Sequence, residues 1–286
     1  MPPASLAPYI TTFYHTRVTG RRGQSVEDWL HPESANLRIG QHAKAKAGIG
    51  NEPLAPVPRI VLSGPTCCAT RFRQTPGRTW GIGFLPLGWA RFVGGDAASY
   101  ADRFVDAARD PALPGLARLE RGLFREDENL EAEAAHLARG LEALPGVPVR
   151  DEAQIIAVHE ALVSGSAGSV AEIAEACAMN IRTLERFCRR AFGFTPNVLL
   201  RRQRFLRSLA RFMLDPSLAW IDTLDEHYYD QAHFVRDFKS FMTMTPSEYA
   251  ALDKPILKAA AFARMKAAGQ AMQVLHPPTA PAGAPD

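Results

Sequence analysis

The sequence predicts an α+β protein, with a β-rich N-terminal half and an all-α C-terminal half that carries two helix-turn-helix units. Residues 9–89 hold short β-branched or aromatic segments separated by Gly, Pro and charged clusters, a pattern typical of strands and turns. From residue 96 onward, apolar residues recur at helical spacing. The segment PGVPV at 145–149 is the best boundary between the halves. We therefore expect a β-rich barrel or sandwich-like domain followed by helices.

Length and composition place the chain among globular proteins. Its 286 residues, 47% of them hydrophobic, fit two domains better than one. Its apolar runs end well short of the roughly 18 residues of a membrane span, and its first residues lack the pattern of a secretory signal. We expect a cytoplasmic location. The four cysteines form no CxxC pair, so we expect free thiols, no metal site and no cofactor.

In the N-terminal half, the predicted strands are ITTFYH, LRIG, RIVLSG and WGIGFLP. Helical spacing then predicts helices over 96–108, with Asp96 as the cap, over 113–123 and over 129–144. Cys67 and Cys68 stand beside a strand end, where we expect small buried residues rather than a redox sensor. The scattered histidines offer no metal-ligand spacing, and Trp80, Phe84, Trp89 and Phe92 are expected to fill the core.

The C-terminal half is predicted to be helical almost throughout. A helix over 151–163 leads through SGSAGS to a short helix that begins near Ser169. A long helix opens at Pro196 and ends near Leu214. Segments 220–226, 231–242 and 247–252 suggest a shorter copy of the same plan, followed by one more helix over 254–274 and a solvated tail.

The most informative stretch is NIRTLERFCRRAF at 180–192. Read as a helix, it places Leu184 and Cys188 on an apolar face and turns its arginines away from that face. Asn180 is suited to be the N-cap, because its amide oxygen can accept a backbone N–H of the first turn. Together with the short helix that precedes it, this arginine-rich helix predicts a helix-turn-helix.

Charge is distributed unevenly in the C-terminal half. Residues 182–211 hold nine arginines against one acid, whereas 212–254 hold three bases against eight acids. Since phosphate neutralisation supplies much of the affinity for DNA, an acidic region binds it poorly. Our hypothesis is that the first unit and the helix that opens at Pro196 grip the duplex, and that the second unit adds selectivity.

The two units echo each other. RTLERFCRRAFGFTPNVLL and AHFVRDFKSFMTMTPSEYA share an arginine, an aromatic at fixed spacing and a TP dipeptide that opens the next helix. With YYDQAHFVRDFK and MTPSEY, residues 169–249 resemble the DNA-binding domain of AraC/XylS transcriptional regulators. HPESANLRIG, LSGPT and WGIGFLPLGWARF more loosely resemble the β-rich sensor domain that precedes it in one branch of that family.

The resemblance implies that each second helix faces DNA at its start and middle, and the arginines nearby are expected to meet phosphate. Glu185 can accept from cytosine N4 or orient a neighbouring arginine, and His233 can contact DNA or simply lie on the surface. The expected DNA-binding residues are Arg182, Glu185, Arg186, Arg189, Arg190, Arg201, Arg202, Gln231, His233 and Arg236.

One departure from the family pattern concerns its turn glycines. This chain has Ala178, His227 and Thr243 at those positions and keeps only Gly193. A non-glycine residue at positive φ is uncommon, so we expect a distorted turn or weaker binding in the second unit.

The expected domains are a sensor or dimerisation domain at 1–145, a helix and linker at 146–168, the double helix-turn-helix at 169–254, and a helix with a disordered tail at 255–286. The predicted function is sequence-specific transcription regulation without catalysis. Candidate partners are double-stranded DNA, a small-molecule effector in the N-terminal domain, RNA polymerase and a second copy of the chain, but no membrane. The alternatives are an enzyme or metal-binding sensor with a DNA-binding tail, and a helix-turn-helix turned to protein interaction.

Overall fold

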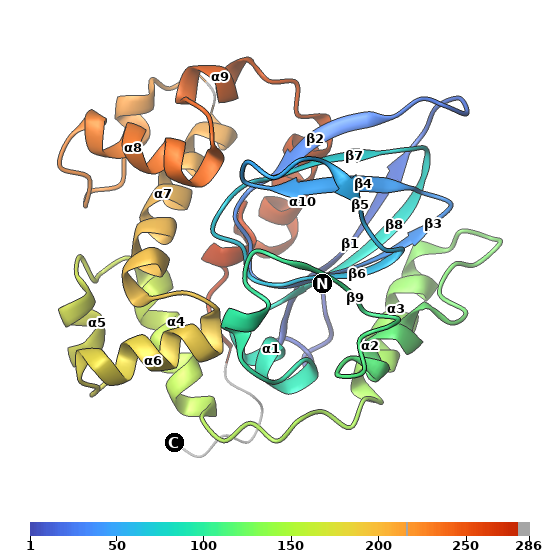
Figure 1. Ribbon diagram of the computed structural model, residues 1–286, viewed down its shortest axis with the longest axis horizontal. Coiled ribbons are helices and arrows are strands. Elements are labelled where there is room, and N and C mark those ends of the chain that lie inside the picture. The colour runs from blue at the N-terminus through green and yellow to red at the C-terminus, as the bar shows by residue number, and fades with distance from the viewer. Residues whose placement is uncertain (216, 280–286) are drawn as a thin grey trace.

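The computed structural model describes residues 1–215 and 217–279. Two antiparallel sheets form the β-rich part, and the helices of the C-terminal half gather on one side of it (Figure 1). The first sheet has the strand order β1-β8-β3-β6-β9 and the second has the order β2-β7-β4-β5. The α+β prediction is confirmed, and the β-rich part is sandwich-like rather than a closed barrel. The strands are β1 (Ile10–Val18), β2 (Val26–Leu30), β3 (Asn36–Gln41), β4 (Ala45–Ile49), β5 (Ala55–Pro56), β6 (Ile60–Ser63), β7 (Thr70–Gln74), β8 (Gly77–Phe84) and β9 (Phe104–Asp106).

The core residues of the first sheet are centred on its middle strand, β3. Leu37 of β3 pairs with Ile82 of β8 on one side and with Leu62 of β6 on the other, and all three side chains are fully buried. Trp80 and Phe84 are buried in the same cluster, as expected of core filling. Burial of this continuous apolar layer favours the observed strand register, because a slip of one residue would turn each of these side chains outward.

The helices and 3-10 turns follow the strands with two exceptions, α1 and η1, which precede β9. The α-helices are α1 (Pro86–Phe92), α2 (Pro114–Ala117), α3 (Leu130–Glu142), α4 (Glu152–Ser164), α5 (Val170–Ala176), α6 (Ile181–Phe192), α7 (Pro196–Leu214), α8 (Gln231–Met242), α9 (Pro246–Ala251) and α10 (Pro255–Ala268), and the 3-10 turns are η1 (Ala97–Ser99), η2 (Arg118–Glu120), η3 (Trp220–Thr223) and η4 (Gln273–Leu275). Across the described ranges, none of these helices has the length and hydropathy that crossing a membrane requires.

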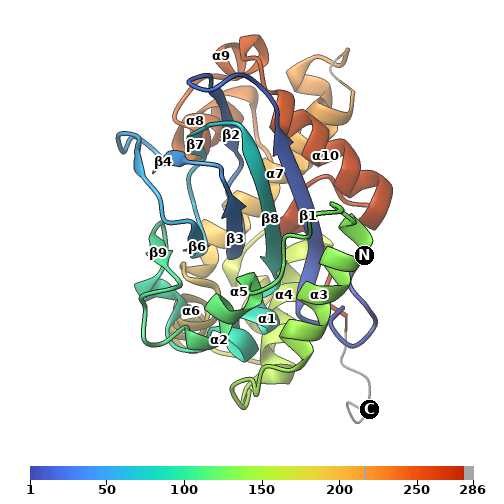
Figure 2. The same ribbon diagram turned by 90° about the vertical axis from the view of Figure 1, so that its right-hand side faces the viewer.

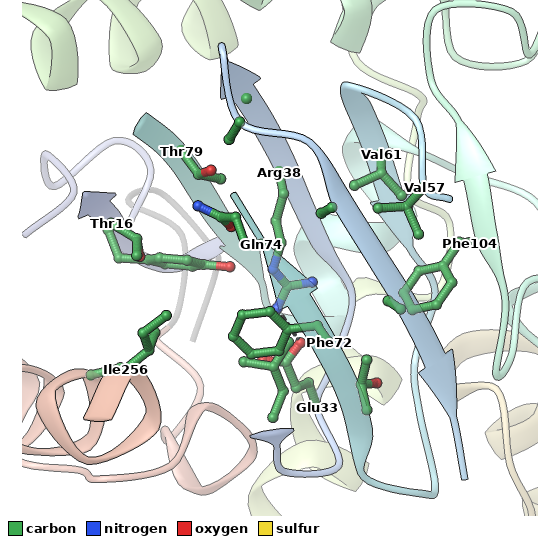
Figure 3. A pocket seen from close by; sticks show the side chains of 18 of the residues that line it. Thr16, Glu33, Arg38, Val57, Val61, Phe72, Gln74, Thr79, Phe104 and Ile256 are labelled. Atoms are coloured by element: carbon green, nitrogen blue, oxygen red, sulfur yellow. Dashed lines mark hydrogen bonds and ion pairs between the residues drawn. The ribbon is translucent and has the colours of Figure 1, made fainter. Parts of the chain in front are cut away.

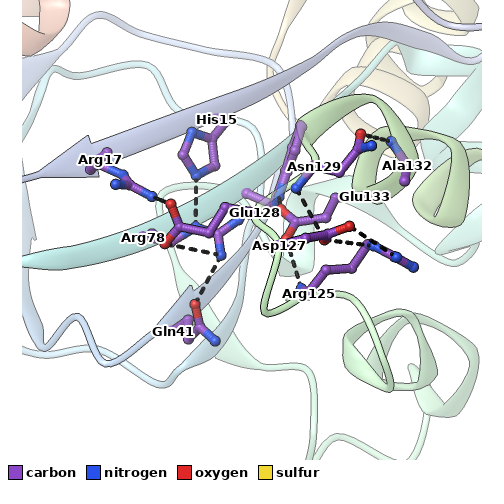
Figure 4. A network of polar contacts seen from close by, with 11 residues as sticks. His15, Arg17, Gln41, Arg78, Arg125, Asp127, Glu128, Asn129, Ala132 and Glu133 are labelled. Carbon is purple, nitrogen blue, oxygen red and sulfur yellow. Dashed lines mark hydrogen bonds and ion pairs between the residues drawn. The ribbon is translucent and has the colours of Figure 1, made fainter.

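A buried carboxylate joins α3 to the first sheet. Glu133 of α3 is fully buried and lies beside Arg78 (Figure 4), from whose Nη2 it accepts a hydrogen bond at 2.5 Å. The same carboxylate oxygen accepts from Trp80 Nε1 at 2.7 Å. Its other oxygen accepts from the backbone N–H of Arg125 at 2.8 Å. Burial raises the pKa of Glu133, but these donors outweigh it and hold that pKa below its ordinary value. The pairing fixes α3 against β8.

Two helix predictions in the N-terminal half are wrong in extent. Over 96–108, Asp96 does cap a helical turn, since it accepts from the N–H of Ala98, but only the 3-10 turn η1 follows. Residues of the same stretch form β9 instead, because they pair with β6 at the edge of the first sheet. The segment 113–123 forms only the short α2 and η2. Pairing with a sheet edge outweighs local helical spacing here.

The C-terminal half shows a similar shortening. The predicted helix over 220–226 is only the 3-10 turn η3. The single helix predicted over 254–274 ends at Ala268, because Gly269 adopts a left-handed φ of 68°, and η4 follows. Within the predicted tail, residues 280–286 lie outside the described residues.

The segment that follows α9 returns to the β-rich part, where α10 lies beside β1 (Figure 2). Asp28 of β2 caps α10, since its Oδ2 accepts from the N–H of Ile256 at 2.6 Å and of Leu257 at 3.0 Å. Gln273 is buried, and its side chain binds Asn36 Nδ2 at 2.8 Å and the Ala35 carbonyl at 3.2 Å. Residues near the two ends of the chain are therefore held together by buried polar contacts.

Candidate nucleic-acid interface

The first helix-turn-helix unit consists of α5 and α6. Ser169 caps α5 by accepting from the N–H of Glu172, and Asn180 caps α6 by accepting from the N–H of Thr183 at 2.9 Å. Leu184 and Cys188 are fully buried against the neighbouring helices. The predicted start of the short helix near Ser169, the predicted cap at Asn180 and the predicted apolar face of α6 are therefore confirmed.

The opposite face of α6 points to solvent. Arg182, Glu185, Arg186 and Arg189 are all exposed, and the described residues provide none of these four with an ion-pair partner. Arg190 is also exposed, but it forms an ion pair with Asp151 at the start of α4. A helix with three unpaired guanidinium groups on one exposed face presents donors in the fork geometry that suits phosphate and guanine.

The arginines of α7 lie differently. Arg201 binds Asp237 of α8, with Nη2 at 2.5 Å and Nε at 3.0 Å from Oδ1. Arg202 is buried, and its Nη1 donates to the Thr66 carbonyl of the β-rich part at 2.8 Å. Burial lowers the pKa of Arg202 to about 10. Arg202 therefore does not reach the surface, where contact with phosphate was expected. The guanidinium of Arg201 is occupied by its ion pair with Asp237.

Two further arginines of α7 point inward. Arg204 is buried, and its guanidinium lies 5.5 Å from the centre of the Tyr228 ring. Arg207 donates from Nε to Asp225 Oδ2 at 2.6 Å, and Asp225 is almost fully buried. These contacts join α7 to the segment that precedes α8. The helix that opens at Pro196 therefore connects the two units through its arginines, and its predicted grip on the duplex is not supported by their positions.

The second unit is built around α8. Asp230 caps it by accepting from the N–H of His233 at 2.6 Å. Gln231 and Arg236 are exposed, and His233 is partly buried. Asp237 is buried on the inner face, where it also accepts from Tyr228 Oη at 3.2 Å. Figure 1 shows α6 and α8 near opposite ends of α7.

Two of the three positions at which this chain lacks the family's turn glycine adopt a left-handed backbone with another residue. Ala178 has φ 51° in the turn between α5 and α6, and Thr243 has φ 59° at the end of α8, whereas His227 has no positive φ. The N–H of Thr243 still caps α8 by donating to the Lys239 carbonyl. The end of α8 is therefore regular, at a conformational cost of roughly 1–2 kcal/mol for each non-glycine residue in this region.

A cavity of about 610 Å³ lies in the β-rich part, and α10 forms one of its walls. Figure 3 shows Arg38, Phe72 and Gln74 around this space, with Ile256 of α10 on another side. Arg38 is held by Glu33, whose Oε2 lies 2.5 Å from Nη2. This wall could not be predicted from the sequence, because α10 is brought to the sheets only by the tertiary fold.

Metal ligation finds no support in the described ranges, where no three His, Cys, Asp or Glu side chains converge. His31, one of the scattered histidines of the N-terminal half, is buried, and its Nε2 lies 2.8 Å from Tyr249 Oη. Burial lowers the pKa of His31 to about 3, so this imidazole is neutral. His31 therefore has a structural contact.

Comparison with known proteins defines the class of the C-terminal half. Residues 173–251, which include both units, match a family described as a helix-turn-helix domain. This segment is an AraC-type helix-turn-helix domain, as the resemblance predicted. Among curated protein sequences, none matches the chain.

Solved structures of ToxT from Vibrio cholerae are similar along most of the chain. An apo variant of ToxT from strain SCE256 has 13% sequence identity and a TM-score of 0.44, over 83% of this chain and 96% of that chain. Wild-type ToxT with bound unsaturated fatty acid has 14% identity and a TM-score of 0.42, over 83% of this chain and 93% of that chain. Similarity at this level says nothing about what the present chain binds.

Proposed function

We propose that the protein is a sequence-specific transcription regulator that reads the major groove with α6 and α8. The main support is the exposed face of α6, on which Arg182, Glu185 and Arg186 lie unpaired in the part of the chain that the structure describes. An arginine fork can donate to guanine O6 and N7 together, and each good contact contributes about 1–3 kcal/mol of discrimination between bases.

The second unit offers fewer cationic groups to DNA. On α8, Gln231 and Arg236 face solvent, whereas Asp237 is turned inward and neutralised by Arg201. An amide such as Gln231 can bind adenine N6 and N7 as a pair. We therefore retain the asymmetric scheme in part: α6 supplies most of the charge, and α8 adds base discrimination.

The experiment is selection of bound sites from random duplexes, followed by affinity measurements on the selected site. For Arg182→Ala we expect affinity to fall roughly 10- to 100-fold, with relaxed preference at one base pair. Arg109→Ala is the matched control, because Arg109 is 89% exposed and lies in the β-rich part. It should leave binding unchanged.

The alternative role in protein interaction gives a different result. If the wild-type chain bound no duplex at about 50 mM salt, where electrostatic binding is strong, the regulator proposal would be wrong. Selection that enriched no sequence, with binding intact, would show that α6 meets only phosphates. In the second case Arg182→Ala should still weaken binding to all duplexes alike, whereas Arg109→Ala should not.

We also propose that the cavity in the β-rich part holds a small-molecule effector. Its volume of about 610 Å³ falls within the usual range for ligand pockets. Its lining mixes apolar groups such as Phe72 and Val61 with the polar Gln74 and with Arg264 of α10. Since α10 follows the helix-turn-helix domain in the chain, an occupant of this cavity contacts both halves of the molecule.

The effector proposal can be tested with the fluorescent apolar anion 1-anilinonaphthalene-8-sulfonate. Ala260 lines the cavity, whereas Ala263 lies on the same helix and is exposed. Ala260→Trp should fill the space and abolish binding of the probe, and Ala263→Trp should not. Equal binding by the two variants would place the probe elsewhere.

A further inference from the structure

Two adjacent thiols lie in the loop that joins β6 to β7. Sγ of Cys67 and Sγ of Cys68 are 3.7 Å apart, and both cysteines are free. The sequence predicted small buried residues here, but both side chains are only half-buried. The pair is therefore accessible from solvent.

The separation of the sulfurs fits two thiolates on a single central atom. Trivalent arsenic is pyramidal and holds two bonded sulfurs somewhat closer together than the observed 3.7 Å, so a small rotation of the two side chains brings both thiolates onto it. A direct bond between the two sulfurs is less suitable. Neighbouring Cα atoms are about 3.8 Å apart, below the usual range of about 4.4–6.8 Å across a disulfide.

The protein supplies only two ligands to such a centre. No third Cys, His, Asp or Glu completes a set in the described ranges. The hydrogen bonds of Asp102 to this pair go to Cys67: it accepts from Sγ at 3.0 Å and from the N–H of the same residue at 2.8 Å. The central atom must therefore bring its remaining substituent with it.

We propose that Cys67 and Cys68 form a binding site for a monosubstituted trivalent arsenical, R–As(OH)₂. This class has one organic group and two exchangeable positions, which matches the number of thiols. Two As–O bonds break and two As–S bonds form, and each thiol proton leaves with a hydroxide as water. Arsenic stays trivalent, so no oxidant or reductant is needed.

The surroundings favour reaction of the pair. Their shared hydrogen bond raises the pKa of Cys67, together with burial, and lowers the pKa of Cys68. Cys68 is therefore the more acidic thiol and reacts first, since the thiolate is the nucleophile. Once one As–S bond exists, the second thiol is held beside the arsenic, and an intramolecular reaction of this kind has a large effective concentration.

The site lies where the β-rich part meets the helix-turn-helix domain. Cys68 Sγ is 3.6 Å from the carbonyl oxygen of Ser240 in α8, and the N–H of Ala69 donates to the Phe241 carbonyl at 2.7 Å. In the same loop, the Thr66 carbonyl accepts from Arg202 of α7. An arsenical with its organic group therefore lies against the end of α8.

The test is intact-mass analysis of the full chain after reaction with phenylarsine oxide, the anhydride of such an arsenical. In excess glutathione, we expect one adduct per chain, because a monothiol cannot match a chelating pair. A dithiol such as 2,3-dimercaptopropanol should remove it. Cys67→Ser and Cys68→Ser should each lower the retained adduct at least tenfold.

Cys177→Ser is the matched control, since Cys177 is a half-buried thiol outside the Cys67–Cys68 pair, and it should retain the full adduct. Serine is close to cysteine in size, so the variants should fold, as circular dichroism can confirm. The proposal is overturned if either single variant keeps the adduct, or if glutathione removes it from the wild-type chain. These outcomes are independent of DNA binding.

The position of the site predicts a second signal. With the arsenical bound, hydrogen exchange at the Ala69 amide should become at least several-fold faster, because the added group disturbs the contact with Phe241. Unchanged exchange at Ala69 in a chain that carries the adduct would show that the site is not coupled to α8.

Discussion

Helices α6 and α7 are consecutive and rich in arginine, yet their arginines lie in opposite environments. On α6, Arg182 and Arg186 are exposed. On α7, Arg202 is buried against the β-rich part, and Arg207 binds the buried Asp225. Local positive charge in a sequence therefore has two separate uses: α6 presents cations to a partner, whereas α7 uses them to hold elements of the same chain together.

The largest expected effect comes from removing one of the inward-pointing arginines of α7. Arg207→Ala leaves the carboxylate of Asp225 buried without its cation, and loss of one partner of a buried pair costs about 3–5 kcal/mol. Because the N–H of His227 also binds this carboxylate, we expect a value near the lower end. Chemical denaturation measures it. Arg186→Ala, on the exposed face, should change the free energy of unfolding by less than about 0.5 kcal/mol.

The same ion pair predicts a pH dependence. Burial raises the pKa of Asp225, but the hydrogen bond and charge of Arg207 outweigh it, so the pKa in the folded state is below its ordinary value. A lowered folded-state pKa contributes stability above the unfolded value of about 3.9, and this contribution is lost as pH falls through the folded value. The difference in unfolding free energy between wild type and Arg207→Ala should therefore be constant near neutral pH and shrink below about pH 4. A difference that stayed constant to pH 2 would show that Arg207 stabilises by packing alone.

The next effect compares the outer faces of the two units. Arg186→Ala should reduce affinity for the selected operator roughly 10- to 100-fold, if its fork binds a guanine. Arg236→Ala should reduce affinity less, because α8 presents few cations and is expected to supply only a small part of the charge that holds the duplex. Titration of labelled duplex at one fixed salt concentration measures both. Equal losses would mean that the two units share the grip, contrary to the asymmetric scheme.

The sequence predicted α6 well because its information is local. The cap at Asn180, the apolar spacing of Leu184 and Cys188, and the exposed arginines all follow from positions within one helix. The general class of the fold was equally accessible, since strand-like and helix-like patterns occupy separate halves.

The inward positions of the α7 arginines could not be predicted from the sequence in the same way. Its arginines form the same kind of run as those of α6, and their partners lie far along the chain: Asp225 for Arg207, and Asp237 for Arg201. The acidic balance of 212–254 suggested repulsion of DNA, but these two acids are buried and neutralised by α7. A net charge counted along the sequence treats such pairs as if they faced solvent.

The smallest expected effect concerns phosphate contact. The logarithm of affinity falls with the logarithm of salt concentration, and each phosphate contact contributes about one unit to the slope. Arg189 is exposed and carries no ion pair within the described residues, so Arg189→Ala should lower the slope by about one. Arg190, which is paired with Asp151, should give a smaller change, because forming a phosphate contact first requires that pair to break. An equal change in slope for Arg190→Ala and Arg189→Ala would show that the ion pair with Asp151 breaks when the protein binds DNA. The ion pair seen at the end of α6 would then not predict which arginine contacts phosphate.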